Sequence, residues 1–186
     1  MTLDEIRTQI DQIDSQIIEL FVKRMECSKH VAEAKAVTGG DVFVLERELA
    51  IIKNRASDVD PVIYDEYVAF LRHLMSVSRR YQYGILTDMQ ERVLSDSLKA
   101  AGLNADLPHS EVTITFSCDC SASDLNLYIN MIKLNNVSIK SMSLETKDEK
   151  QMITMTLIGK ITDANMKQLL CQIGKESTDF GIVALR

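Results

Sequence analysis

The sequence lacks any apolar run of about 18 residues, the length that a helix needs to span a bilayer, although 46% of its 186 residues are hydrophobic. It also lacks an excess of basic residues, since 21 lysines and arginines stand against 27 aspartates and glutamates and give a net charge of −6. These absences argue against a membrane partner and against nucleic acid as the main ligand. Any anion must therefore be bound by a local cluster of cations.

Cysteine and histidine are scarce, with four and three copies respectively. Cys118 and Cys120 form a single C-x-C motif without the second pair or the histidines that a zinc site requires. No metal and no cofactor are therefore expected. The polar, acidic start MTLDEIR is not typical of a signal peptide. We expect a cytoplasmic protein whose thiols are reduced.

Glycine and proline are absent from residues 3–37, where apolar residues recur with alternating spacings of three and four. These residues are Leu3, Ile6, Ile10, Ile13, Ile17 and Leu20. The pattern predicts one helix of roughly 50 Å, at about 1.5 Å per residue. Thr2 and Glu5 can form a capping box at its start, and Gly39-Gly40 ends it. A helix of this length cannot be buried within one small domain, so we predict an antiparallel homodimer.

Two further helices complete a predicted helical domain, residues 1–84. One covers residues 45–56, and the other starts at Asp60-Pro61, an N-cap followed by proline at the first helical position, and ends near Tyr83. A linker, residues 85–109, contains a fourth predicted helix.

From residue 110 onwards the hydrophobic pattern alternates between strands and helices. Strands are predicted at residues 112–116, 137–145, 152–158 and 180–185, and helices at residues 121–134 and 162–176. This β-α-β-β-α-β order is that of a ferredoxin-like domain, predicted for residues 110–186. The fold class is therefore a three-helix domain followed by an α/β domain.

Polar residues interrupt the apolar stripes of two helices. The stripe of the first helix reaches Arg24, and that of the third reaches Ser78 and Gln82. A charge on an apolar stripe is costly unless something pairs with it. Lys35 projects within about 20° of Arg24, some 16 Å further along the helix, which leaves room for a small dianion. Arg7 is about 25 Å from Arg24 along the helix, so it cannot easily join Arg24 and Lys35 in the same chain, whereas Arg7 of the partner subunit in an antiparallel dimer could.

The second helix adds Arg47 and Glu48 in its first turn. The complete set contains cations, a carboxylate, a hydroxyl and an amide, but no nucleophile beside a base. Such a set can bind an anionic substrate and stabilise developing charge, whereas covalent catalysis needs an activated nucleophile.

In this order and spacing, residues 3–83 resemble the all-helical class of chorismate mutases. The matching pieces are Ile6-Arg7, Ile10-Asp11, Ile13-Asp14, Arg24, Ala34-Lys35, Glu46-Arg47-Glu48 and Ser78-Arg79-x-x-Gln82. The resemblance implies an intertwined homodimer that converts chorismate to prephenate, a pericyclic step in the biosynthesis of phenylalanine and tyrosine. The element order of residues 110–186 resembles an ACT domain, which implies regulation by an aromatic amino acid.

The resemblance also implies how the substrate is held. Arg24 and Arg7 of the partner subunit bind its carboxylates. Lys35 and Gln82 donate to the ether oxygen, where negative charge develops as the C–O bond breaks. Because Gln82 is a neutral donor, we predict activity that does not require acid.

The remaining roles implied by the resemblance concern the ring of the substrate. Glu48 and Arg47 lie at the ring hydroxyl, and Ser78 lies at the ring carboxylate. The expected catalytic residues are Lys35, Gln82, Arg24 and Glu48, and the expected substrate-binding residues are these four with Arg7, Arg47 and Ser78.

Some features depart from the family pattern or leave alternatives open. Val44 stands where the family often has aspartate, and Arg79 and Arg80 are predicted to be surface charges. An isochorismate pyruvate-lyase on the same fold would use the same cations. A non-enzymatic dimeric module that senses amino acids is the other alternative, although a scaffold would more simply carry leucine at the polar stripe positions.

Overall fold

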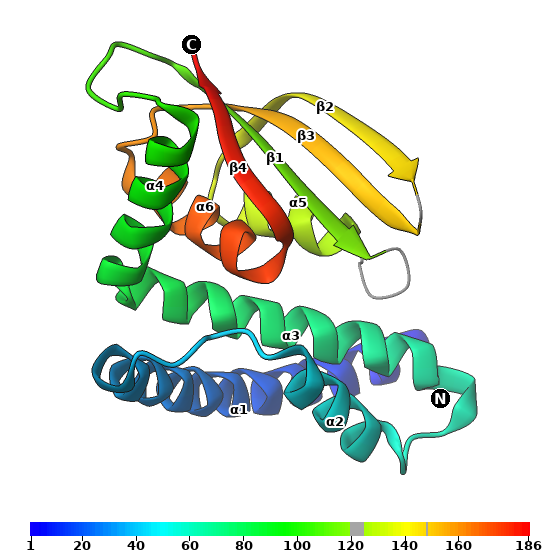
Figure 1. Ribbon diagram of the computed structural model, residues 1–186. Coiled ribbons are helices and arrows are strands. Elements are labelled where there is room, and N and C mark those ends of the chain that lie inside the picture. Colours follow the sequence, from blue (N-terminus) through cyan, green and yellow to red (C-terminus); the bar gives the residue numbers. More distant parts are fainter. Residues whose placement is uncertain (120–124, 148) are drawn as a thin grey trace.

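The computed structural model describes residues 1–119, 125–147 and 149–186. Its helical N-terminal part comprises α1 (Leu3–Thr38), α2 (Leu45–Ala56), the 3-10 turn η1 (Pro61–Ile63) and α3 (Tyr64–Ile85). Helix α4 (Thr87–Ala101) leads into the C-terminal body, which comprises β1 (Glu111–Asp119), α5 (Leu125–Leu134), β2 (Ser138–Lys147), β3 (Lys150–Ile158), α6 (Ala164–Glu176) and β4 (Thr178–Leu185) (Figure 1). These elements follow the predicted order, while residues 121–124 of one predicted helix lie outside the described residues.

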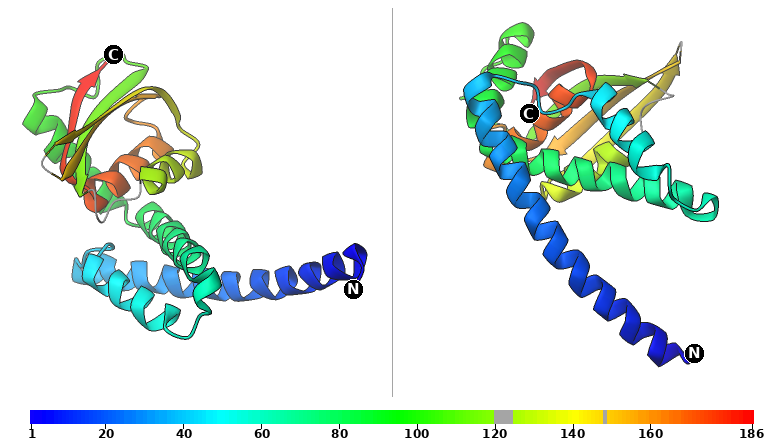
Figure 2. Two further views of the ribbon diagram at one scale, coloured as in Figure 1. Left: turned by 90° about the vertical axis from the view of Figure 1, so that its right-hand side faces the viewer. Right: turned by 90° about the horizontal axis from the view of Figure 1, so that it is seen from below.

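Helix α1 is the long helix that the sequence predicts. The Thr2 backbone N–H donates to the Glu5 carboxylate over 2.7 Å, and the Glu5 N–H donates to the Thr2 hydroxyl over 3.3 Å, which together form the capping box. Gly39 ends the helix with a φ of 74°, a conformation that glycine adopts without steric cost. The N-terminal half of α1 extends beyond the other elements (Figure 2).

The apolar stripe of α1 is exposed in the single chain. All six of its residues from Leu3 to Leu20 are more than a third exposed. The buried residues of α1 are instead Ser28 and Ala32, on the part of the helix near α3. Contiguous exposed apolar surface of this kind marks an interaction site.

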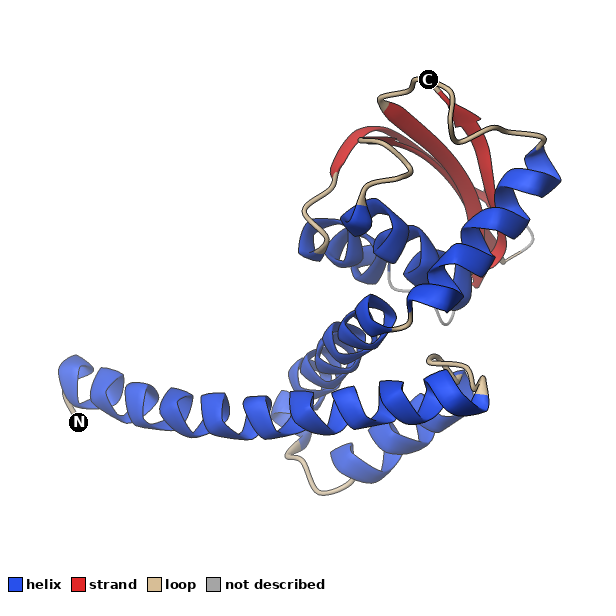
Figure 3. Cartoon of the chain, turned by 90° about the vertical axis from the view of Figure 1, so that its left-hand side faces the viewer, coloured by secondary structure: helices blue, strands red, loops and turns tan. Residues whose placement is uncertain are grey.

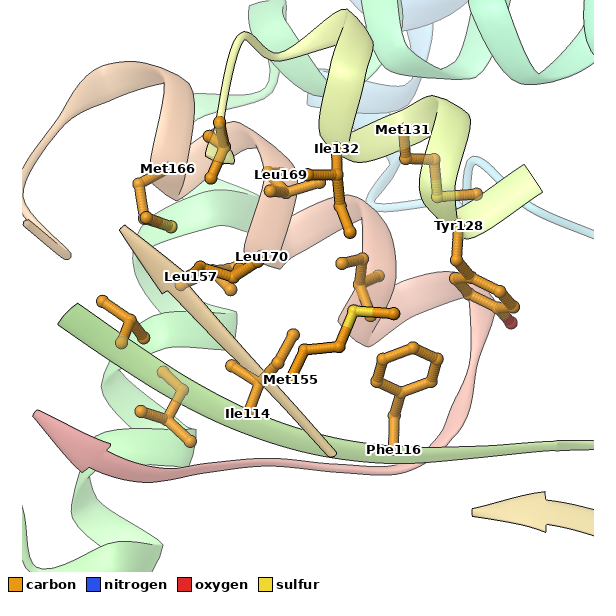
Figure 4. Packing of buried hydrophobic residues seen from close by; sticks show 14 of the residues in the cluster. Ile114, Phe116, Tyr128, Met131, Ile132, Met155, Leu157, Met166, Leu169 and Leu170 are labelled. Atoms are coloured by element: carbon orange, nitrogen blue, oxygen red, sulfur yellow. The ribbon is translucent and has the colours of Figure 1, made fainter. Parts of the chain in front are cut away.

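The C-terminal body is a four-stranded antiparallel sheet in the order β2-β3-β1-β4. Helices α5 and α6 lie on the face of the sheet that is turned toward α3 (Figure 1). Alternate residues of β1 and β3 enter the core, as period-two patterning requires. The core brings together Ile114 and Phe116 of β1, Met155 and Leu157 of β3, Tyr128, Met131 and Ile132 of α5, and Met166, Leu169 and Leu170 of α6 (Figure 4).

Helix α3 runs between the two parts of the molecule (Figure 3). It contacts α1 and α2 in the helical part and α5 and α6 in the C-terminal body. The Gln168 side-chain amide of α6 donates to the Arg80 backbone carbonyl of α3 over 2.7 Å. Helix α4, from the predicted linker, packs against α6 and β4, and its Leu94 is buried in the core of the sheet. Within the described ranges, no helix is both long and apolar enough to cross a membrane.

Candidate active site

A cavity of about 350 Å³ lies among α1, α2 and α3. Its lining includes six of the seven side chains predicted to bind substrate. They are Arg24 and Lys35 from α1, Arg47 and Glu48 from α2, and Ser78 and Gln82 from α3. Residues up to 58 positions apart in the sequence (82 − 24) therefore line one small volume.

Two cations of α1 are half-buried in this cavity and bind neutral oxygens. The Arg24 guanidinium donates to the Ser78 hydroxyl and, over 3.3 Å, to the Leu74 carbonyl. The Lys35 ammonium donates to the Asp41 carbonyl over 2.6 Å. Burial lowers the pKa of Arg24, and burial together with nearby Arg47 lowers that of Lys35.

The cavity has more positive charge than its own carboxylates neutralise. Among the described residues, none of Arg24, Lys35 and Arg47 forms an ion pair. Charged groups that are partly removed from water are stabilised by an opposite charge. The cavity is therefore suited to a small molecule that carries more than one negative charge.

The amide of Gln82 adds a neutral group to this lining. Its side-chain oxygen is buried and has no hydrogen-bond partner among the residues that the structure describes. An unpartnered buried polar atom costs about 1–3 kcal/mol. The amide NH2 is the donor that Gln82 can offer to a ligand in the cavity.

Arg79 is the site residue that the sequence interpretation assigned wrongly. It was expected at the surface, but only 4% of it is exposed. Its guanidinium donates to the Glu48 carboxylate and lies over the Phe43 ring, with 5.0 Å from Cζ to the ring centroid. Its burial depends on the C-terminal body, because the other partner of Arg79 is Glu176 of α6.

Arg7 and Val44 were also singled out in the sequence, Arg7 as a substrate-binding residue and Val44 as a departure from the family pattern. Arg7 is outside the cavity, where it is exposed and paired with Asp4 over 3.3 Å. Val44 lines the cavity and is the N-cap residue of α2, without a side-chain capping bond. The described residues include no cluster of three or more histidine, cysteine, aspartate or glutamate side chains that could hold a metal ion.

Residues 6–83 match the model of the family described as chorismate mutase type II. An intracellular chorismate mutase of Mycolicibacterium smegmatis is 31% identical over 70 residues, which cover 38% of this chain and 67% of that protein. The chain belongs to the type II chorismate mutase family.

Two further relatives are similar to part of the chain. The intracellular chorismate mutase of Mycobacterium bovis is 34% identical over 70 residues, 38% of this chain and 66% of that protein. The T-protein of Haemophilus influenzae is 30% identical over 91 residues, 46% of this chain but only 24% of that protein. The chain thus spans less than two thirds of these two relatives. No solved structure matches the chain at a significant level.

Proposed function

We propose that this chain is a chorismate mutase that converts chorismate to prephenate without a covalent intermediate. The observation that carries the proposal is the convergence of Arg24, Lys35 and Arg47, none of them ion-paired within the described residues, on one cavity that Gln82 also lines. Chorismate is a dicarboxylate, and its size suits a cavity of about 350 Å³. Family membership supports the same conclusion.

The proposed roles follow from where charge develops in the reaction. Negative charge builds on the ether oxygen as the C–O bond breaks, and Lys35 and Gln82 are the donors proposed for that oxygen. A preorganised donor of this kind contributes about 3 kcal/mol to the reduction of the barrier. Arg24 binds a substrate carboxylate, and holding the flexible substrate in its folded, reactive form lowers the barrier further.

The other three cavity residues are proposed to fix the ring. Arg47 and Glu48 face the ring hydroxyl, and Ser78 faces the ring carboxylate. Glu48 is held by Arg79, so its carboxylate reaches the substrate in one orientation. Because every proposed role is binding or donation, no side chain has to change covalent state during turnover.

We also propose a homodimer in which Arg7 of the partner subunit completes each site. The exposed apolar stripe of α1 supports this, since pairing with a second α1 would bury it. The position of Arg7, exposed on the extended half of α1, supports it as well.

Mixed dimers test the contribution of Arg7. Arg7→Ala and Arg24→Ala are each expected to be inactive as pure dimers. If the site is shared, a dimer with one chain of each variant contains one intact site and one doubly altered site. Random mixing makes about half of the dimers mixed, so about a quarter of wild-type activity should return. No recovery in dimers that are shown to mix would place Arg7 and Arg24 in the same chain's site.

For the C-terminal part we propose a ferredoxin-like, ACT-like regulatory domain, residues 110–186, joined to the helical domain, residues 1–84, by residues 85–109. The strand order and the antiparallel pairing support this fold. A mostly apolar cavity of about 230 Å³ between α2, α3 and the C-terminal body supports a small effector, with Arg72 and Lys175 in its lining. Phenylalanine or tyrosine is the proposed effector. Calorimetry that detects no binding of either would contradict this assignment.

The experiment that tests the main proposal follows the loss of chorismate absorbance on adding the purified chain, with the product identified by its acid conversion to phenylpyruvate. Conversion to prephenate is the expected result. Release of pyruvate from isochorismate, without turnover of chorismate, would identify a pyruvate-lyase on the same fold. Turnover of neither substrate, together with binding of an amino acid, would identify a sensor.

A further inference from the structure

The Arg79 guanidinium is held on three sides inside the protein. Both carboxylate oxygens of Glu176 accept from it, one from Nε and one from Nη2, each over 2.8 Å. Nη1 donates to the Glu48 carboxylate, and Phe43 covers one face of the group. Glu48 lines the proposed active site, whereas Glu176 belongs to the C-terminal body. Arg79 therefore joins a site residue to the second part of the molecule.

Glu176 is itself firmly placed. Only 3% of its side chain is exposed, and the Gln172 amide donates to its carboxylate over 3.0 Å. The Tyr128 hydroxyl of α5 donates to its backbone carbonyl over 3.0 Å. Burial raises the pKa of Glu176, and Arg79 opposes that rise. The two carboxylates in turn outweigh the effect of burial on Arg79 and raise its pKa above the usual value.

The contact between Arg79 and Glu176 fixes the orientation of the guanidinium and also pairs its charge. A bidentate pair between arginine and a carboxylate holds the guanidinium in one plane. With Nε and Nη2 bound to Glu176, Nη1 is the nitrogen directed at Glu48. Without Glu176, other N–H groups of Arg79 would be free to bind Glu48 and turn its carboxylate.

The described lining of the site cavity comes entirely from residues 24–82. The C-terminal body therefore reaches the site through side chains that bridge the two parts. The Lys175–Asp41 ion pair, at 2.7 Å, is another such bridge, but the oxygen of Asp41 that binds Lys35 belongs to its backbone. Arg79 contacts the carboxylate of a proposed catalytic residue directly.

We propose that Glu176 is a positioning residue for the reaction, which acts through Arg79 to hold the Glu48 carboxylate in its productive orientation. The C-terminal body thus completes the site of the helical part. This inference rests on the proposed mutase function, since Glu48 must act on the substrate for its orientation to affect the rate.

A double-mutant cycle between Glu176→Gln and Glu48→Gln tests this relation in the full chain. Glu176→Gln preserves the shape of the side chain and removes its charge, and should lower kcat/KM for chorismate about tenfold or more, as misplacement of a site group does. In the Glu48→Gln background, the same change should alter kcat/KM less than about twofold, because the group that it positions is already lost. Equal losses in both backgrounds would overturn the inference, since a general structural role does not depend on Glu48.

The matched control is Gln168→Ala on the same helix. It removes the 2.7 Å hydrogen bond from α6 to α3 without touching Arg79, and should leave kcat/KM within about twofold of wild type. Circular dichroism shows whether each variant folds. If Glu176→Gln does not fold, Glu176→Asp takes its place in the cycle, because aspartate keeps the charge but is one methylene too short for the same bidentate contact.

The two proposals fail in different ways. A wild-type chain without chorismate turnover would overturn the mutase function and this inference with it. Turnover by wild type with an unchanged rate in Glu176→Gln would overturn the inference alone. An equal loss in Gln168→Ala would also overturn it, because the rate would then follow any loosening of the junction.

Discussion

Replacing Arg24 by leucine separates a catalytic site from a structural one. Arg24 is half-buried, binds Ser78 and the Leu74 carbonyl, and forms no ion pair within the described residues. Losing these two hydrogen bonds costs about 1 kcal/mol each. Removing a partly desolvated charge and packing an apolar side chain in its place offset that loss. The free energy of unfolding should therefore change by less than about 1 kcal/mol, or rise.

The activity of Arg24→Leu should change far more than its stability. Removing one charged donor from a preorganised site costs about 3 kcal/mol of transition-state stabilisation. Since each 1.4 kcal/mol is a factor of about ten in rate, kcat/KM should fall at least about 100-fold. The assays are the loss of chorismate absorbance and urea unfolding followed by circular dichroism.

The control for this prediction is Arg55→Leu, which removes the same charge from an exposed position in the last turn of α2. It should leave kcat/KM within about threefold of wild type, because a distant exposed charge is screened by solvent and salt. Two results would refute the reasoning for Arg24. One is activity in Arg24→Leu close to wild type, and the other is a loss of more than about 3 kcal/mol in unfolding free energy, which would make the arginine structural.

Three further predictions concern pH, thiol chemistry and helix capping. Because burial lowers the pKa of Lys35, the rate should fall on the alkaline side at a lower pH than it would with a lysine of unshifted pKa. A pH–rate profile checks this. A steep gain in rate below about pH 6 would contradict the proposal that the neutral Gln82 amide is a donor. Iodoacetamide should modify Cys27 well before Cys171. Cys27 is exposed and lines the site cavity, whereas burial raises the pKa of the Cys171 thiol to about 12. Peptide mass spectrometry gives the order of labelling, and equal labelling would show that Cys171 is accessible. Val44→Asp should stabilise the chain by about 1 kcal/mol in urea unfolding, since aspartate can cap α2 where valine makes no capping bond; a similar gain from Val44→Ala would rule out capping as the cause.

Local pattern was enough to find the helices and three of the residues that line the cavity. The three–four spacing and the capping box of Thr2 and Glu5 predicted α1 to within about one residue at its C-terminal end. The polar residues found on apolar stripes, Arg24, Ser78 and Gln82, all line the cavity, because a stripe faces a neighbouring element and a polar group on it must meet a partner or a ligand. These features depend on neighbours within a few turns of the same helix, so they can be recognised without tertiary information.

Two decisive features depended on how the parts pack. Arg79 was wrongly predicted at the surface, because the sequence of α3 does not show that this helix is covered on both sides. Nor could residue spacing within α3 show that Glu176, 97 residues later, would be the partner of Arg79. The sequence predicted that a second copy of the chain covers the stripe of α1, and within one chain the stripe is exposed while Ser28 and Ala32 are buried. Periodicity identifies which residues share a face of a helix, but long-range packing determines what covers that face. That is why only the tertiary structure revealed the link from the C-terminal body to Glu48.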